Sequence, residues 1–240
     1  ACAEVPAPVR PALEIALRRH RAVDRRAARA VTTLVANSHV TKERIRRLWG
    51  RDSVVIHPPV EVERFHLDEP RDYYLLVGEL VTHKRAQLAL EASRRARRRM
   101  VVVGGGPDLG RLRERYGRSA EFLGRVDDST LTNLYSHAAA VVVPSIEEFG
   151  ITAVEAQAAG RPVIGVNAGG TRETVVHGRT GWLVPPDDVD ALANALRSDH
   201  HEGELASPAE IRGHARRFST AVFQRRLRAV VDESVSRRSR

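Results

Sequence analysis

AVVVPSIEEFGITAVEAQAAGRPVIGV, residues 140–166, joins two continuous apolar runs through a short alanine-rich segment. Each apolar run is typical of a strand that is buried on both faces of a sheet. The segment between the runs, residues 150–159, has the apolar spacing of a helix. A strand, a helix and a second strand in this order predict a βαβ unit with parallel strands.

The same alternation continues on both sides of this unit. Further apolar runs predict strands at residues 73–78, 100–105, 120–124 and 181–185. The stretches between these strands predict helices at residues 85–96, 109–116, 129–137, 171–177 and 189–197. We therefore expect an α/β fold: a Rossmann-like parallel sheet with helices on both faces. Ligands of such sheets bind at the carboxyl ends of the strands, where several of these runs end in Gly or Pro.

The flanking segments differ from this regular part. Residues 11–30 predict one or two amphipathic helices with basic faces, residues 31–38 a buried strand, and residues 41–50 a helix closed by Gly50. Pro58 and Pro59 read as a linker, and residues 207–240 predict two further helices. We expect three parts: residues 1–58 as the remnant of another domain, residues 59–205 as the main domain, and residues 206–240 as terminal helices.

Composition excludes several classes of protein. The 240 residues are 42% hydrophobic, so a core needs no disulfides, and the single cysteine, Cys2, fits a reducing compartment. No apolar run approaches the ~20 residues that cross a bilayer. The formal net charge of +9 attracts phosphates of any kind, but only 5% of residues are aromatic, which suits a single-strand nucleic-acid binder poorly. Neither the histidines nor the cysteine show the spacing of a metal site.

Glu155 raises a question of its own. It lies on the alanine-rich helix beside an apolar stripe, and ionised carboxylates are seldom buried without a partner. Glu147 and Glu148 precede the helix, where acidic groups suit the positive end of its dipole. Glu155 lies past the first turn, so that explanation fails for it. A carboxylate there can accept two hydrogen bonds from the vicinal hydroxyls of a ribose.

Two other places are candidates for phosphate binding, each with an ordinary structural alternative. The glycine-rich turn GGGPDLG, at the end of the strand predicted at 100–105, lets backbone N–H groups approach a phosphate, although Leu109 stands where a dinucleotide fingerprint needs its third glycine. The alternative is a tight turn with no ligand. Lys84, near a helix start, can hold a diphosphate or can be a solvated lysine.

These stretches together resemble the retaining glycosyltransferases of family 4, which have the GT-B fold. The resemblance rests on the Glu-x7-Glu pattern of Glu147 and Glu155 and on further stretches in the family's order: ANSHVTKERI, VVIHPPVEVERF, YYLLVGELVTHKR, VVVGGGPDLGRLR, EFLGRVDDSTLTNLYSHAAAVVVPS, GGTRETVVHGRTGWLVPP and HARRFSTAVFQRRL. PPVE with THKR is most similar to the branch of O-antigen mannosyltransferases. The resemblance implies that residues 59–205 bind the donor sugar nucleotide, that residues 1–58 end the acceptor domain, and that residues 206–240 cross back to it.

The resemblance also implies residue roles. Glu155 holds the ribose hydroxyls, Glu147 contacts the donor sugar, and Lys84 stabilises the departing diphosphate. Backbone groups and flanking residues of the donor site are Phe149, Gly150, Ile151, Arg85, Gly104, Gly105, Arg125 and Val126. Many members carry arginine where this chain has Glu79, so either Glu79 points away from the diphosphate or Arg85 compensates.

The implied reaction is transfer of a hexose, mannose if the branch holds, from GDP-mannose or another nucleotide-diphosphate sugar to a glycan or lipid-linked acceptor, with retention and without a required metal or other cofactor. Fixed cations and N–H donors aimed at the leaving diphosphate lower the barrier. The implied setting is polysaccharide biosynthesis in the cytoplasm. The basic first 30 residues either face the inner side of the plasma membrane or are solvated helices. Two alternatives stay open: an inactive fragment that binds sugar nucleotides, and a basic nucleic-acid-binding protein.

Overall fold

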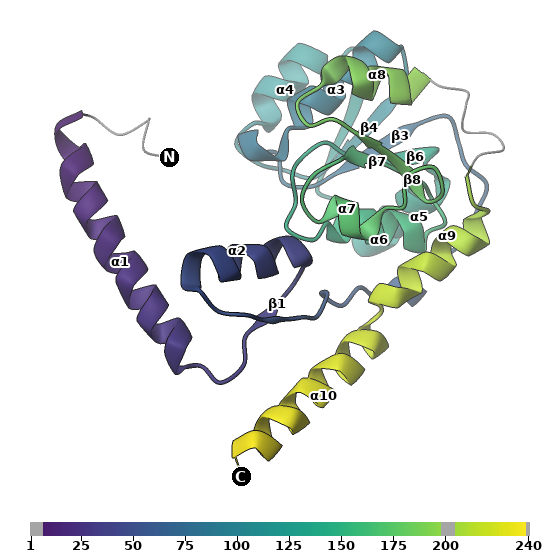
Figure 1. Ribbon diagram of the computed structural model, residues 1–240. Coiled ribbons are helices and arrows are strands. Elements are labelled where there is room, and N and C mark those ends of the chain that lie inside the picture. Colours follow the sequence, from purple (N-terminus) through teal and green to yellow (C-terminus); the bar gives the residue numbers. More distant parts are fainter. Residues whose placement is uncertain (1–6, 198–204, 239–240) are drawn as a thin grey trace.

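A computed structural model describes residues 7–197 and 205–238, and at its centre is one parallel sheet of six strands (Figure 1). The strand order is β5-β4-β3-β6-β7-β8. The strands are β3 (Tyr74–Val77), β4 (Met100–Val103), β5 (Ala120–Gly124), β6 (Ala140–Val143), β7 (Val163–Val166) and β8 (Gly181–Val184). Every neighbouring pair is parallel, as the continuous apolar runs predicted. The fold class is therefore confirmed.

Helices cover both faces of this sheet (Figure 1). Leu76 and Val142 pack on one face with the first group of helices, and Leu75 and Val141 pack on the other face with the second group, because successive strand side chains point to opposite sides. The first group is α3 (Ala86–Ala96), α4 (Leu109–Tyr116) and α8 (Val189–Arg197), and the second is α5 (Asp128–His137), α6 (Ile151–Ala158) and α7 (Thr171–Thr174). Helix α7 is shorter than predicted: residues 171–177 were expected to be helical, but the backbone is extended at Val175.

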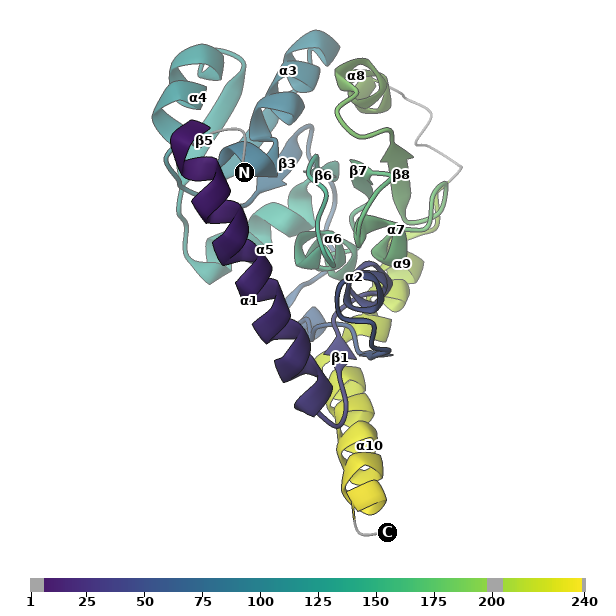
Figure 2. The ribbon, with the colours of Figure 1, turned by 60° about the vertical axis from the view of Figure 1, so that its left-hand side comes forward.

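The first segment forms no part of the six-stranded sheet. One helix, α1 (Arg10–Ala30), stands apart from the sheet (Figure 1), and of its residues only Ala28 is buried. Figure 2 shows the same helix in front of the main domain. Strand β1 (Val35–Ala36) pairs with β2 (Val54–Val55) in a separate two-stranded parallel sheet. The buried strand predicted for residues 31–38 is therefore wrong in length and in burial, since Val31 and Val35 are 45% and 41% exposed.

Helix α2 (His39–Trp49) follows β1 and confirms the predicted helix, although it begins two residues before the predicted start at residue 41. Ser38 caps its start by accepting a hydrogen bond from the N–H of Thr41, and Gly50 ends it in the left-handed conformation with φ 65°. After β2, the chain passes through the short 3-10 helix η3 (Val62–Arg64) into the large sheet. Helix η3 thereby places Arg64 beside Glu155 of α6.

The C-terminal helices return to the first segment. Helix α9 (Pro208–Ala215) starts with a capping box between Ser207 and Glu210, and α10 (Thr220–Arg238) follows the 3-10 helix η6 (Arg216–Phe218). The hydroxyls of Thr33 and Ser234 lie 2.8 Å apart, so α10 lies beside the segment before β1. The division into three parts stays a prediction, and Cys2 lies outside the described residues. Within those residues, no helix combines the length and apolar character needed to span a membrane.

Candidate functional site

A cleft opens where the strand order reverses, between β3 and β6. The chain runs from β3 to β4 in one direction and from β6 to β7 in the other, and ligands of open parallel sheets bind at such a switch point. The cleft has a volume of about 310 Å³, and it is lined by the carboxyl ends of both strands, by Lys84 and by Thr152 at the start of α6. The strand topology therefore selects this position as the candidate ligand site.

Lys84 and Glu147 meet in this cleft. Lys84 ends the 3-10 helix η4 (Thr82–Lys84), and its Nζ lies 2.9 and 2.8 Å from the two carboxylate oxygens of Glu147. The hydroxyl of Ser145 donates a further hydrogen bond to Glu147. Lys84 is therefore ion-paired rather than freely solvated, and its side chain is still 35% exposed. A diphosphate that binds Lys84 must share this cation with Glu147 or displace it.

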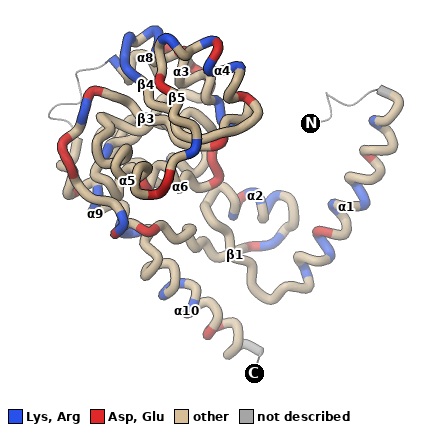
Figure 3. Tube along the Cα trace, turned by 180° about the vertical axis from the view of Figure 1, so that it is seen from behind, with Lys and Arg blue, Asp and Glu red and all other residues tan. Residues whose placement is uncertain are grey.

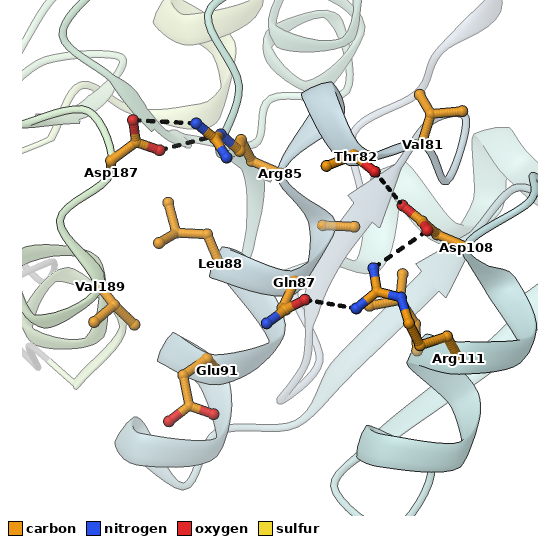
Figure 4. A pocket seen from close by; sticks show the side chains of 12 residues that line it. Val81, Thr82, Arg85, Gln87, Leu88, Glu91, Asp108, Arg111, Asp187 and Val189 are labelled. Carbon is orange, nitrogen blue, oxygen red and sulfur yellow. Dashed lines mark hydrogen bonds and ion pairs between the residues drawn. The ribbon is translucent and has the colours of Figure 1, made fainter. Parts of the chain in front are cut away.

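The charge of the cleft is less favourable to a diphosphate than expected. Glu79 lines the same cleft as Lys84 and Glu147, so the charged side chains of the lining carry two negative charges and one positive. Arg85 lies elsewhere: its guanidinium pairs with Asp187 at 3.1 Å in a second cavity, between α3, α4 and α8 (Figure 4). In this structure, Arg85 does not offset the charge of Glu79. Its expected role in donor binding stays a prediction.

Glu155 lies one turn after Ile151, the first residue of α6, and its carboxylate has two partners. The Nη2 of Arg64 lies 3.2 Å from Oε1, and the hydroxyl of Tyr135 on α5 donates to Oε2 at 2.8 Å. Burial raises the pKa of Glu155, and the hydrogen bond from Tyr135 and the charge of Arg64 act against this rise. These contacts explain how the carboxylate is tolerated beside apolar residues. Both carboxylate oxygens thus already have a partner, and Glu155 does not line the cleft, so its expected role at the ribose stays a prediction.

The start of α6 offers backbone donors beside the cleft. Gly150 has φ 89°, a left-handed conformation that favours glycine, and it places the first turn of the helix directly after the loop of Glu147. Ile151 begins the helix, and the first N–H groups of any helix lack an acceptor within it. Phe149 is buried, with its ring 5.3 Å from that of His57 in a stacked arrangement, so only its backbone can face a ligand.

The glycine-rich turn after β4 has a packing reason. A Cβ on Gly104 would lie 1.9 Å from the carbonyl oxygen of Gly78, and one on Gly106 would lie 2.5 Å from that of Leu80. Two neighbouring turns therefore touch through their backbones, which favours the tight-turn interpretation. Gly105 faces a different neighbour, because its Cβ position lies 3.6 Å from Nε of Arg125. The structure thus places the turn of Gly104 and Gly105 next to Gly78 and Arg125.

Val126, next to Arg125, packs partly buried against the core on the side of α5 and α6. The predicted site residues therefore occupy separate places. Lys84 and Glu147 line the cleft, Glu155 on α6 does not line it, and Arg85 lines the cavity between α3, α4 and α8. Gly104, Gly105 and Arg125 lie at the neighbouring strand ends.

Sequence reasoning missed the loop before α7. A Cβ on Gly169 would lie 2.3 Å from the carbonyl oxygen of Glu147, and the N–H of Gly170 donates to that same oxygen at 2.7 Å. Glu173 then accepts hydrogen bonds from the N–H groups of His39 and Val40 at the start of α2. The Gly-Gly pair was the one signal in the sequence that this loop makes a close backbone contact.

Glu173 also meets two histidines that are distant in sequence. His57 Nε2 lies 3.1 Å from its Oε2, and the potential ligand atoms of His39, His57 and Glu173 all lie within 4.8 Å of one another. No metal spacing was visible in the sequence, because these residues come from three separate elements. Both oxygens of Glu173 already accept hydrogen bonds from α2, which accounts for the carboxylate without an ion.

Comparisons with known proteins agree with the fold. The family of glycosyl transferases group 1 matches residues 60–215. D-inositol 3-phosphate glycosyltransferase 2 of Catenulispora acidiphila is 31% identical over 228 residues, covering 79% of this chain and 53% of the relative. Glycogen synthase of Mycobacterium tuberculosis is 33% identical over 196 residues, covering 74% and 47%. The chain thus spans about half the length of these curated relatives.

A solved structure supports the fold. Anabaena Alr3699/HepE, in complex with UDP and glucose, superposes with a TM-score of 0.74 at 21% identity, covering 85% of this chain and 64% of that one. The family match extends over the six-stranded sheet, the cleft between β3 and β6, and both residues of the Glu-x7-Glu pattern. The chain belongs to the glycosyl transferases group 1 family.

Proposed function

We propose that this chain is the part of a glycosyltransferase that binds the nucleotide-sugar donor. The observation that carries the proposal is the cleft at the strand switch point, where Lys84, Glu147 and the start of α6 converge. A cation and free helix N–H groups suit a diphosphate, and the buried carboxylate of Glu155 suits the ribose beyond it. The family membership supports the same assignment.

We propose residue roles that are compatible with these positions. Lys84 takes up negative charge as the anomeric C–O bond breaks and the electron pair passes to the diphosphate. Glu147 orients the ammonium of Lys84 when the cleft is empty, and it accepts hydrogen bonds from donor-sugar hydroxyls when the diphosphate holds Lys84. The base lies toward Arg125 and Val126, at the end of β5.

The finer predictions are part of this proposal. Transfer of a hexose such as mannose from GDP-mannose, with retention of configuration, rests on the resemblance of the PPVE and THKR stretches. The relatives and structural neighbours are more varied: they include a D-inositol 3-phosphate glycosyltransferase, a glycogen synthase, and a structure in complex with UDP and glucose. We therefore propose a nucleotide-diphosphate sugar as donor and test UDP beside GDP.

The charge distribution supports this assignment over nucleic-acid binding. Figure 3 shows basic and acidic residues interspersed along the chain. Several arginines of the main domain are paired with acids; examples are Arg94 and Arg95 with Glu91, and Arg99 with Glu121. We propose that the acceptor is a glycan or a lipid-linked molecule. We also propose that the basic helix α1 contacts a membrane surface, which a vesicle-binding assay tests.

A thermal-shift panel of UDP-, GDP- and ADP-sugars tests the proposed function. A ligand that binds only the folded state raises the melting temperature, and we expect one nucleotide base to give the largest rise. Glu155→Gln keeps the shape of the side chain but removes its charge, and should abolish most of the rise. Glu121→Gln is the matched control, since Glu121 is exposed at the far edge of the sheet and pairs with Arg99.

Two outcomes of the panel would contradict the proposal: no rise with any nucleotide sugar, or an equal rise in wild type and Glu155→Gln. Each measurement is repeated with magnesium and with a chelator. Because the charged cleft lining is net negative, this comparison tests directly whether Lys84 and the helix N–H groups suffice without a metal ion.

A further inference from the structure

His57 lies in the linker between β2 and η3, and the backbone on both sides of it is anchored. The N–H of Ile56 donates to a carbonyl of β1 at 2.9 Å, and the N–H of Val60 donates to a carbonyl of η6 at 3.0 Å. Pro58 and Pro59 follow His57 directly, and a proline disfavours helical conformations of the residue before it. The imidazole therefore projects from a backbone with little freedom.

The side chain of His57 packs between two phenylalanine rings. Its ring is stacked on that of Phe149, with centroids 5.3 Å apart and planes inclined by 23°, and it meets the ring of Phe218 edge-on at 5.3 Å. The two phenylalanine rings also meet each other at 5.5 Å, and both residues are buried. The three rings come from the linker, the loop before α6 and η6, so one imidazole joins three segments that are distant in sequence.

Glu173 fixes the orientation of this imidazole. His57 Nε2 lies 3.1 Å from Oε2 of Glu173, and the two side chains are 18% and 13% exposed. Glu173 also accepts hydrogen bonds from the N–H groups of His39 and Val40, at 2.9 and 3.1 Å. The carboxylate would keep these two donors if the imidazole were removed. The contact therefore orients the imidazole, but Glu173 does not depend on it.

The ring of Phe149 is the point at which His57 reaches the donor cleft. Phe149 belongs to the loop 147–150, which carries Glu147 at the cleft and leads into the first turn of α6. Gly170 holds the backbone of this loop: its N–H donates to the carbonyl of Glu147 at 2.7 Å, and a Cβ on it would lie 2.3 Å from Cα of Phe149. The loop is thus held through its backbone by Gly170 and through its buried side chain by His57.

We infer that His57 is a positioning residue for donor binding. Its ring holds Phe149, and it thereby sets where the loop 147–150 presents Glu147 and the first N–H groups of α6 to the diphosphate. The inference rests on the proposed function, because it concerns the same cleft. His57 does not line the cleft, so it acts through Phe149 and not by contact with the ligand. A contact between two such rings corresponds to a change of about two- to tenfold in an equilibrium constant.

Three substitutions separate the ring of His57 from its hydrogen bond. His57→Ala removes both, His57→Phe keeps a ring against Phe149 without the bond to Glu173, and His57→Gln keeps a donor for Glu173 without the ring. Titration calorimetry of the full chain with UDP, GDP, uridine and guanosine gives the affinity advantage of the preferred diphosphate over its nucleoside.

We expect this advantage to fall about fivefold in His57→Ala and in His57→Gln, and to be restored in His57→Phe. Nucleoside affinity should stay unchanged, because the loop presents its groups to the diphosphate. His39→Ala is the matched control. It removes an exposed imidazole whose ring lies 6.2 Å from that of His57, and it keeps the N–H that Glu173 accepts, so the advantage should stay unchanged.

Hydrogen exchange reports on the loop directly. In His57→Ala, the amide hydrogen of Gly170, which bonds to the carbonyl of Glu147, should exchange about fivefold faster, because local opening then meets less resistance. The amide hydrogen of Tyr74 at the start of β3, which bonds to the carbonyl of Arg99, should exchange at its wild-type rate. A general loss of stability would instead accelerate both.

Three results would overturn the inference. The first is that His57→Ala leaves the diphosphate advantage and the exchange of Gly170 unchanged. The second is that diphosphate and nucleoside lose affinity by the same factor, and the third is that His57→Gln rather than His57→Phe restores the advantage. Failure of the proposed function has a different signature, namely a wild type that binds no nucleotide. In that case the exchange of Gly170 still decides whether His57 holds the loop.

Discussion

The hydroxyl of Tyr135 gives a sharp test of how Glu155 is held. Tyr135 is fully buried, its ring meets that of Phe65 edge-on at 5.4 Å, and its hydroxyl donates to Glu155 at 2.8 Å. Tyr135→Phe removes the hydroxyl and keeps the ring, so packing against Phe65 should persist. The variant therefore isolates one hydrogen bond to a carboxylate.

The magnitude follows from the kind of acceptor. A hydrogen bond to a charged group contributes about 1.5–3 kcal/mol. Arg64 remains on the other oxygen, and the Glu155 side chain is 18% exposed, so water and Arg64 offset part of the loss. We expect Tyr135→Phe to lower the free energy of unfolding by about 2 kcal/mol. The control is Tyr73→Phe, whose hydroxyl donates to the neutral carbonyl of Leu134 at 2.8 Å. That variant should cost about 1 kcal/mol.

Urea unfolding near neutral pH measures both variants, and a double-mutant cycle with Glu155→Gln isolates the contact. Tyr135→Phe should cost at least about 1 kcal/mol less in the Glu155→Gln background, because a neutral amide is then the acceptor. The reasoning is refuted if Tyr135→Phe costs no more than Tyr73→Phe. An unchanged cost of Tyr135→Phe in the Glu155→Gln background would refute it equally.

Three further predictions concern backbone strain and pH. Arg97 ends α3 with φ 55°, so Arg97→Gly should raise the unfolding free energy by about 1 kcal/mol, whereas Arg97→Ala should not. Gly104→Ala places a Cβ against Gly78 and should lower the free energy of unfolding by at least about 2 kcal/mol. Gly110→Ala on α4, with open space around it, should raise the free energy of unfolding by about 0.5–1 kcal/mol. Urea unfolding of these two variants and of the two Arg97 variants tests this order. Burial raises the pKa of Glu155 above 4.5, so the folded state binds this proton more tightly than the unfolded state. Stability contributed by this group should therefore fall as pH rises through its folded pKa, and Glu155→Gln should remove that slope in unfolding curves measured upward from the ordinary pKa of 4.5.

The sheet could be predicted from the sequence because its signal is local. The run AVVV at residues 140–143 is apolar at every position, and all four residues are buried, as a strand covered on both faces requires. The same reasoning failed at residues 31–38, where the apolar run is real but the strand is two residues long. An apolar run shows that a segment is suited to burial, but not which partner covers it.

The site could be predicted only in part, because its contacts join distant residues. Lys84 and Glu147 were each singled out, but their ion pair depends on β3 and β6 being neighbours, which no local pattern specifies. Arg64, which contacts Glu155 across 91 residues, carried no signal at all. The side-chain type indicated the chemistry of each position, and the topology decided which of those groups meet.

The most direct test of the central claim, that the cleft at Lys84 binds the diphosphate of a nucleotide, is a calorimetric comparison of UDP and GDP with uridine and guanosine. In the wild-type chain, the preferred diphosphate should bind at least about tenfold more tightly than its nucleoside, because Lys84 and the helix N–H groups contact the added charge. Lys84→Ala should remove this advantage and leave nucleoside affinity unchanged. Equal affinity for nucleoside and diphosphate in the wild type, or an advantage that survives Lys84→Ala, would contradict the account.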